Sequence, residues 1–206
     1  MFFGTSRTTK ATAAAELAAL GAWAALNSGD RVGAVVFADE EIVEIKPHRS
    51  RENVLRICHE LVRINSQLSA DNRTARPEML NDALRRAVNV AKHDHLVVLV
   101  TDYAGDDEET HRHATRLARH NDVLATLVYD PLGISIPVNG HAEVTDGVQQ
   151  VSIDVSRPVN ERFEDEFRRL SQRIRQHLRS IRIPVLPIST YEPVVEQLLG
   201  ALGARR

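Results

Sequence analysis

Apolar runs of strand length, separated by helical patterns, constrain the fold of this 206-residue chain more than any other feature. Nearly continuous apolar runs occupy residues 31–38, 96–101 and 122–130. Such runs are typical of strands that are covered on both faces. An alternating run at 41–47 follows the first of them closely and predicts a hairpin. We therefore predict an α/β fold whose sheet is mostly parallel, with one antiparallel edge strand.

Helical periodicity accounts for most of the remaining chain. Helices are predicted at 10–29, 50–64, 78–93, 106–120, 161–181 and 192–203, with a last strand at 183–190 and a small hairpin at 141–155. Ser50 is the expected N-cap of the second helix. Asp106 and Glu109 have capping-box spacing at the start of the fourth. No repeat or linker interrupts this order, so we predict one domain over residues 1–206.

Composition and charge exclude several classes of protein. A formal net charge of −2 provides no general basic field, so nucleic acid is not an expected partner. No run approaches the roughly 20 apolar residues of a membrane span, and no signal-peptide pattern opens the chain. The single cysteine, Cys58, lies on the apolar stripe of a predicted helix, where it fits a buried thiol in a reducing compartment. We expect a cytoplasmic protein.

Asp102 is the strongest candidate for chemistry because it comes directly after a buried strand. Sites in parallel sheets lie outside the carboxyl ends of the strands, and a carboxylate there suits Mg²⁺. A loop-capping role is the alternative. The histidine pairs His93/His95 and His111/His113 lack metal-ligand spacing and are expected at the surface. No phosphate-binding glycine loop or nucleophile motif is present, so nothing in the sequence favours an enzyme.

Three stretches resemble von Willebrand factor A-like domains: residues 1–39, "NRTARPEMLNDALRRA" and "VVLVTDY". The first stretch, with "FFG" before a lysine-bearing alanine-rich helix and "GDRVGAVVF", is similar to the bacterial domain-of-unknown-function 58 family. Genes of that family commonly accompany MoxR-type AAA+ ATPases. The resemblance implies a Rossmann-like three-layer sandwich in which helices cover both faces of the sheet.

The resemblance also implies a metal-ion-dependent adhesion site with three contributions. Asp102 corresponds to the aspartate after the fourth strand of such domains, although Tyr103 replaces the usual glycine. Thr74 matches the threonine of the second loop, where Ser66 and Ser69 are alternatives. The D-x-S-x-S element would precede Met1 and is not in the sequence. In its full form such a site holds Mg²⁺ or Mn²⁺; residues 1–206 are expected to bind metal weakly or not at all.

The same resemblance places a central strand between residues 31–38 and 96–101, and the sequence lacks it. Two strand edges would then face a gap, and each buried unpaired N–H or C=O group costs about 1–3 kcal/mol. We expect that the start codon is placed too late, at an internal methionine. A fragment, or edges that close on each other or on a partner strand, are the alternatives.

The function implied is that of a non-enzymatic protein-interaction domain with a partial metal-ion-dependent adhesion site. Its partner would be a MoxR-type ATPase, in the assembly or maturation of other proteins. The alternative is an α/β enzyme, phosphatase-like or receiver-like, which uses Asp102 at the carboxyl edge of the sheet. Asp39 and Asp130 also follow predicted strands and would supply its further acidic groups.

Overall fold

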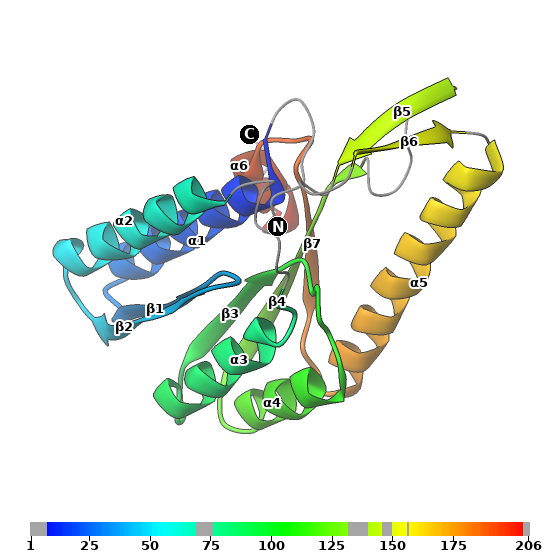
Figure 1. The fold of residues 1–206 in the computed structure, drawn as a ribbon. Coiled ribbons are helices and arrows are strands. Elements are labelled where there is room, and N and C mark those ends of the chain that lie inside the picture. The colour runs from blue at the N-terminus through cyan, green and yellow to red at the C-terminus, as the bar shows by residue number, and fades with distance from the viewer. Residues whose placement is uncertain (1–7, 69–75, 132–139, 146–149, 156, 204–206) are drawn as a thin grey trace.

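The computed structural model describes residues 8–68, 76–131, 140–145, 150–155 and 157–203. Helices and strands alternate along this part of the chain, and the α/β prediction is confirmed (Figure 1). The helices are α1 (Lys10–Asn27), α2 (Arg51–Gln67), α3 (Met79–Val90), α4 (Glu108–Ala118), α5 (Arg157–Ser180) and α6 (Val194–Ala201). The strands are β1 (Val32–Phe37), β2 (Ile42–His48), β3 (Leu96–Thr101), β4 (Asp122–Tyr129), β5 (Gly140–Thr145), β6 (Gln150–Val155) and β7 (Val185–Ser189).

The described strands form three separate hydrogen-bonded groups. β3, β4 and β7 make a parallel sheet in that order, with Leu96 opposite Asp122 and Ala125 opposite Val185. β1 and β2 make an antiparallel pair, with Ala34 opposite Ile45. β5 and β6 form the predicted second hairpin, whose turn at 146–149 lies outside the described residues. The predicted antiparallel hairpin therefore exists, but no ladder joins it to the parallel sheet.

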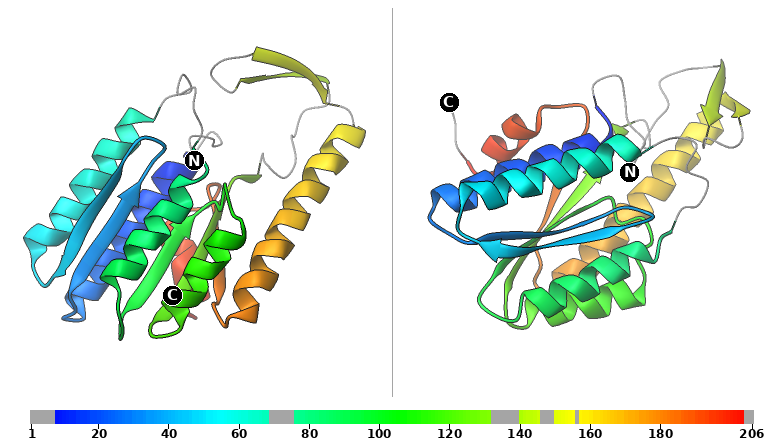
Figure 2. Two further views of the ribbon diagram at one scale, coloured as in Figure 1. Left: turned by 60° about the horizontal axis from the view of Figure 1, so that its bottom comes forward. Right: turned by 60° about the vertical axis from the view of Figure 1, so that its left-hand side comes forward.

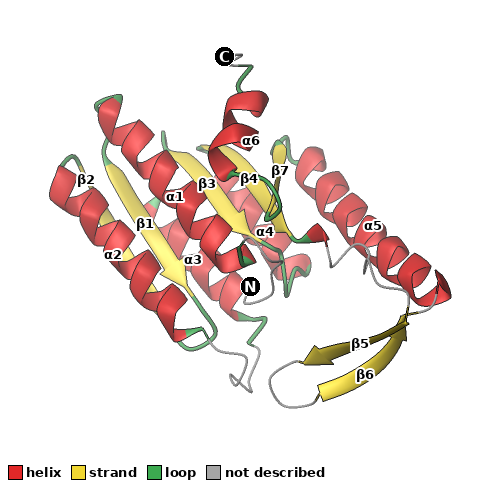
Figure 3. Cartoon of the chain, turned by 90° about the horizontal axis from the view of Figure 1, so that it is seen from above, coloured by secondary structure: helices red, strands yellow, loops and turns green. Residues whose placement is uncertain are grey.

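Helices cover both faces of the strand layer (Figure 2). On one face, α1 and α6 pack on β4 and β7 around Leu17, Val128, Ile188 and Val194. The other face carries α3 and α4, with the last turns of α5. α1 and α2 together cover the β1–β2 pair. The arrangement leaves the carboxyl ends of β1, β3 and β4 at one side of the molecule (Figure 3).

Three local predictions are corrected by the structure. The N-cap of α4 is Asp107, whose carboxylate accepts from the N–H of Glu109 and Thr110, and not Asp106. α5 begins at Arg157, four residues before the predicted start. His113 is buried, with 5% of its surface exposed, and is therefore not a surface residue.

Candidate functional site: a cleft beside the carboxyl edge of β3

A cleft of about 1970 Å³ lies between β1 and β3. Both strands are six residues long, they run in the same direction (Figure 3), and neither is hydrogen-bonded to the other. The facing edges of two parallel strands are thus left open within the described part of the chain. The gap expected from the absence of a central strand is present. The cleft is larger than the ~300–1,000 Å³ of ordinary small-molecule pockets.

Apolar side chains line this cleft from the helices on both faces. Ala14, Ala18 and Ala22 of α1 contribute small side chains, and Leu84 and Ala87 of α3 contribute to its wall as well. The lining leaves room rather than filling it, because most of the α1 contribution is alanine. A ligand that fills this space must be apolar toward both helical layers.

β3 exposes apolar side chains beside its open edge. Leu96 is 71% exposed and Val98 is 43% exposed, although both belong to a run that is apolar throughout. Val97 and Leu99, which alternate with them, pack into the core on the α3–α4 side. A strand with apolar residues on both faces is typical of the interior of a parallel sheet, not of its edge.

Asp102 lies at the carboxyl end of β3, as predicted, and its partner comes from the start of α1. Its Oδ2 is 2.7 Å from the Nζ of Lys10, and its Oδ1 accepts a hydrogen bond from the N–H of Ala104. The Lys10 and Asp102 side chains are only 21% and 10% exposed. Burial raises the pKa of the Asp102 carboxyl, but the ammonium of Lys10 and the Ala104 hydrogen bond outweigh burial and hold that pKa below its usual range.

The loop after β3 contains two residues, Tyr103 and Gly105, with positive φ angles. Gly105 has φ +86°, and a Cβ there would lie 2.4 Å from the carbonyl oxygen of Pro77. Tyr103 also has a positive φ, 57°, and its ring is buried. The close approach of Gly105 to Pro77 brings the loop after β3 against the segment that leads into α3. The described end of the second predicted loop, at Pro77, is therefore adjacent to the loop after β3.

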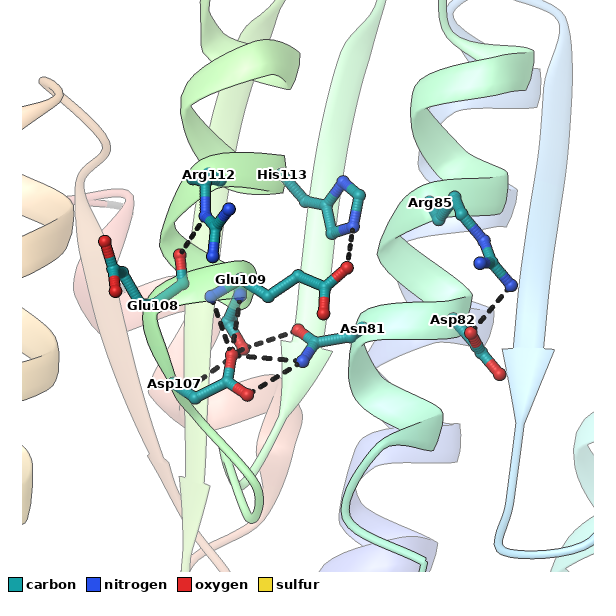
Figure 4. A network of polar contacts seen from close by, with 9 residues as sticks. Asn81, Asp82, Arg85, Asp107, Glu108, Glu109, Arg112 and His113 are labelled. Carbon is teal, nitrogen blue, oxygen red and sulfur yellow. Dashed lines mark hydrogen bonds and ion pairs between the residues drawn. The ribbon is translucent and has the colours of Figure 1, made fainter.

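A polar network fixes the start of α4 on α3 next to this loop (Figure 4). The Asp107 carboxylate accepts two hydrogen bonds, of 3.0 and 3.1 Å, from the side-chain amide of Asn81. The Thr110 hydroxyl donates to the Asn81 carbonyl oxygen, and the Asp107 N–H donates to the Thr110 hydroxyl. His113, one turn further along, has its Nε2 3.5 Å from Glu109. The groups of Asn81, Asp107 and Thr110 satisfy one another, so their network is structural. Among the described residues, both ring nitrogens of the buried His113 lack a hydrogen-bond partner.

The other predicted ligands are not brought to Asp102. Thr74 and Ser69 lie outside the described residues. Ser66 is exposed in the last turn of α2, where its hydroxyl donates to the carbonyl of Arg63. Across the described ranges, no group of three or more His, Cys, Asp or Glu side chains could hold a metal ion. The described residues thus do not fit a divalent-cation site, because Asp102 is held by an ammonium group.

Of the three aspartates that the enzyme hypothesis needs, two lie close together. Asp102 and Asp130 line one small cavity of about 110 Å³, together with Lys10. Asp130, however, accepts a hydrogen bond from the buried Thr190 hydroxyl. Asp39 does not line that cavity and instead accepts from the N–H of Arg76. The cavity therefore brings together two of the three aspartates.

Lys10 is the residue of this site that sequence reasoning missed. It precedes Asp102 by 92 positions, and no spacing rule connects them. Its signal is a lysine at the first position of a helix, where the helix dipole disfavours a cation and where no acidic residue occupies the first turn. Such a lysine needs a carboxylate partner elsewhere in the fold.

The fold and site define a class: an open α/β protein with its candidate site at the carboxyl edge of parallel strands. A family model described as "Protein of unknown function DUF58" matches residues 1–177, and the chain belongs to this family. No curated protein and no solved structure matches the chain significantly. Within the part of the chain that the structure describes, every helix is too short or too polar to cross a membrane.

Proposed function

We propose that this DUF58 chain is a non-enzymatic protein-interaction domain whose working surface is the carboxyl edge of its sheet. The observation that carries the proposal is the position of Asp102, a nearly buried carboxylate at the end of β3 and beside the cleft. Ligands of open α/β sheets bind outside the carboxyl ends of the strands. The single cysteine and the near-neutral charge support a cytoplasmic location.

The proposed architecture is a von Willebrand factor A-like three-layer sandwich with one further strand in the cleft. α1 begins at the carboxyl edge, beside Asp102, and leads into β1, which is parallel to β3. A helix that precedes a parallel strand in this way forms the second half of a βαβ unit, and the first strand of such a unit pairs beside the second. The proposed further strand would therefore be the one that leads into α1.

The strand can be tested by adding it. Six apolar residues that form strands readily, such as valine and isoleucine, are joined through a short linker ahead of residue 1. Burying each of them contributes about 1.5–3 kcal/mol, against about 1–2 kcal/mol for ordering its backbone. With the added hydrogen bonds we expect Tm to rise by about 5–15 °C.

The matched control carries the same extension with proline at its third and fourth positions, because proline cannot donate the ladder hydrogen bonds. We expect no rise in Tm for this control. An all-apolar extension that behaves like the proline control would contradict the strand proposal.

The proposed partner is a MoxR-type AAA+ ATPase, and the proposed process is the assembly or maturation of other proteins. The support is the family resemblance together with an acidic group at the expected edge. The test is binding of the purified chain, with and without the added strand, to the MoxR-type ATPase encoded nearest to it. Asp102→Ala should weaken binding at least tenfold, whereas Asp94→Ala, at the amino end of β3, should leave it unchanged.

Mg²⁺ or Mn²⁺ belongs to this proposal only in a form that supplies ligands beyond the described residues. By the family resemblance, those ligands are a D-x-S-x-S element on the added strand and Thr74. An extension that ends in D-x-S-x-S tests this directly, since Mg²⁺ should raise its Tm and leave that of the serine-to-alanine version unchanged.

The enzyme hypothesis is the second candidate, and the cavity shared by Asp102 and Asp130 favours it. A receiver-like or phosphatase-like protein would transfer a phosphoryl group to or from such a carboxylate. Incubation with a phosphodonor followed by intact-mass measurement decides the point. A gain of one phosphate that Asp102→Asn abolishes would favour the enzyme over the interaction domain.

A further inference from the structure

Lys10 occupies a position that is electrostatically unfavourable within its own helix. It is the first residue of α1, where the N–H groups at the helix start carry a partial positive charge. The N-cap, Thr9, accepts from the N–H of Thr12 but brings no negative charge, and the first turn contains no acidic residue. The cost of this placement must be offset by a contact outside the helix.

The carboxylate of Asp102, in turn, needs a positively charged partner. Its side chain is 10% exposed, and a carboxylate removed from water in this way requires a positive partner. Lys10 supplies that partner at 2.7 Å, and the Ala104 N–H occupies the other oxygen. Both oxygens of Asp102 thus already accept hydrogen bonds from the protein.

We propose that, in residues 1–206 without further ligands, the ammonium group of Lys10 supplies the positive charge that a divalent cation would bring to Asp102, so that Lys10 and a cation exclude one another there. The pair joins the start of α1 to the end of β3, which are the two elements that meet at the carboxyl end of the cleft. Lys10 is therefore a positioning residue, because it holds α1 in place through Asp102.

The choice of lysine supports this role. Only three of the 26 basic residues of the chain are lysine. An ammonium is a compact point charge with three donors, whereas the planar guanidinium of arginine favours paired contacts to a carboxylate. The surface pair of Arg63 and Glu41 is of the second kind, with distances of 2.8 and 2.7 Å. Of the two basic side chains, lysine is the one whose compact charge most resembles that of a metal ion, and the chain has lysine beside Asp102.

The role of Lys10 deepens the proposed function, because it assigns the charge at the carboxyl edge of the sheet. This role rests on the proposed function in one respect, namely that the edge binds a partner. If the chain needs no cation at Asp102, EDTA should leave that binding unchanged. Loss of the Lys10–Asp102 ion pair would change Tm of the chain measured without a partner. Failure of the interaction proposal would appear only in the binding experiment with the partner.

The experiment compares Tm in EDTA and in millimolar MgCl₂ for the unaltered chain, Lys10→Met, and Lys10→Met combined with Asp102→Asn. In EDTA, Lys10→Met should lower Tm by roughly 5–10 °C, because it leaves a nearly buried carboxylate without its ammonium partner. The double variant should be more stable than Lys10→Met, since no charge remains uncompensated. Mg²⁺ should raise Tm of Lys10→Met alone. Lys46→Met, at an exposed lysine of β2, is the matched control and should change nothing.

Two results would overturn the inference: Mg²⁺ that stabilises the unaltered chain as much as Lys10→Met, or a double variant no more stable than Lys10→Met. If Lys10→Met fails to fold, Mn²⁺ binding followed by electron paramagnetic resonance on the unaltered chain decides the question. We expect all the Mn²⁺ to remain free, and a bound Mn²⁺ that Asp102→Asn releases would refute the exclusion.

Discussion

Replacing Asp107 by alanine tests the polar network between α3 and α4. The carboxylate of Asp107 caps α4 through the N–H groups of Glu109 and Thr110, at 2.8 and 2.9 Å. The same carboxylate accepts both hydrogen bonds from the side-chain amide of Asn81 (Figure 4). Asp107→Ala therefore removes a helix cap and an interhelical contact together.

The magnitude follows from these two losses. Losing an N-cap side chain costs about 1 kcal/mol, within a range of about 0.5–2 kcal/mol. The amide of Asn81, which is 7% exposed, loses its acceptor, and an unsatisfied buried polar group costs about 1–3 kcal/mol. We expect a total of about 2–4 kcal/mol. In a chain of this size that total lowers Tm by about 5–15 °C.

Urea unfolding followed by far-ultraviolet circular dichroism measures the change, with the midpoint expected to fall at an unchanged m value. Asp107→Asn keeps a good capping side chain and should cost less than half as much. The matched control is Asp106→Ala. Asp106 does not cap α4, and its carboxylate lies 3.8 Å from the Arg173 guanidinium, beyond hydrogen-bond distance, so its removal should cost less than that of Asp107.

The contribution of Asp107 to stability depends on pH. Hydrogen bonds from the Thr110 N–H and from Asn81 hold the pKa of Asp107 below its usual range. A lowered pKa in the folded state stabilises the fold above the unfolded value of about 3.9, and this contribution disappears as the pH falls below it. The difference between the unaltered chain and Asp107→Ala should narrow below about pH 4. A difference that stays constant to pH 2, or an equal loss in Asp106→Ala, would refute the assignment.

Two further changes test other contacts by thermal unfolding. Gly105→Ala should destabilise the fold by about 2–4 kcal/mol, because it adds a Cβ against the Pro77 carbonyl at a left-handed φ. Gly200→Ala should stabilise the fold by up to about 1 kcal/mol, because Gly200 lies inside α6 with open space around it. Equal effects of the two glycine changes would contradict the loop conformation. Arg63→Met breaks a half-exposed bidentate pair with Glu41 and a contact with Glu60, and should lower Tm slightly in low salt and hardly at all in high salt. A large loss that salt leaves unchanged would argue against a surface ion pair.

Local patterns were sufficient to predict most elements of the fold. The apolar runs at 31–38, 96–101 and 122–130 correspond to β1, β3 and β4, because a strand covered on both faces is nearly continuously apolar. Ser50 caps α2 as predicted, since the cap acts within three residues. The open edges of β1 and β3 were expected from the family resemblance and not from periodicity, whereas the separation of the strands into three hydrogen-bonded groups was not predicted. The single-domain prediction for 1–206 stays a prediction.

Features that depend on distant contacts were predicted less well. Histidine periodicity placed His113 at the surface, yet α3 packs against that face of α4 and buries it. Asp106 has capping-box spacing to Glu109 in the sequence, but Asn81 on another helix binds Asp107, which is the N-cap. Asp102 was predicted at the correct edge, but its partner Lys10 lies at the far end of the sequence. Secondary structure leaves such pairings open because tertiary packing decides them.

The open edges of β1 and β3 affect how these 206 residues behave in solution. An unpaired, apolar strand edge is a template on which a strand of another molecule can pair, and natural proteins blunt such edges with charged residues or proline. β3 carries neither, and its exposed Leu96 and Val98 face the cleft. Concentrated solutions of the chain alone should therefore self-associate through this edge. A lysine in place of Val98 should keep the molecules apart.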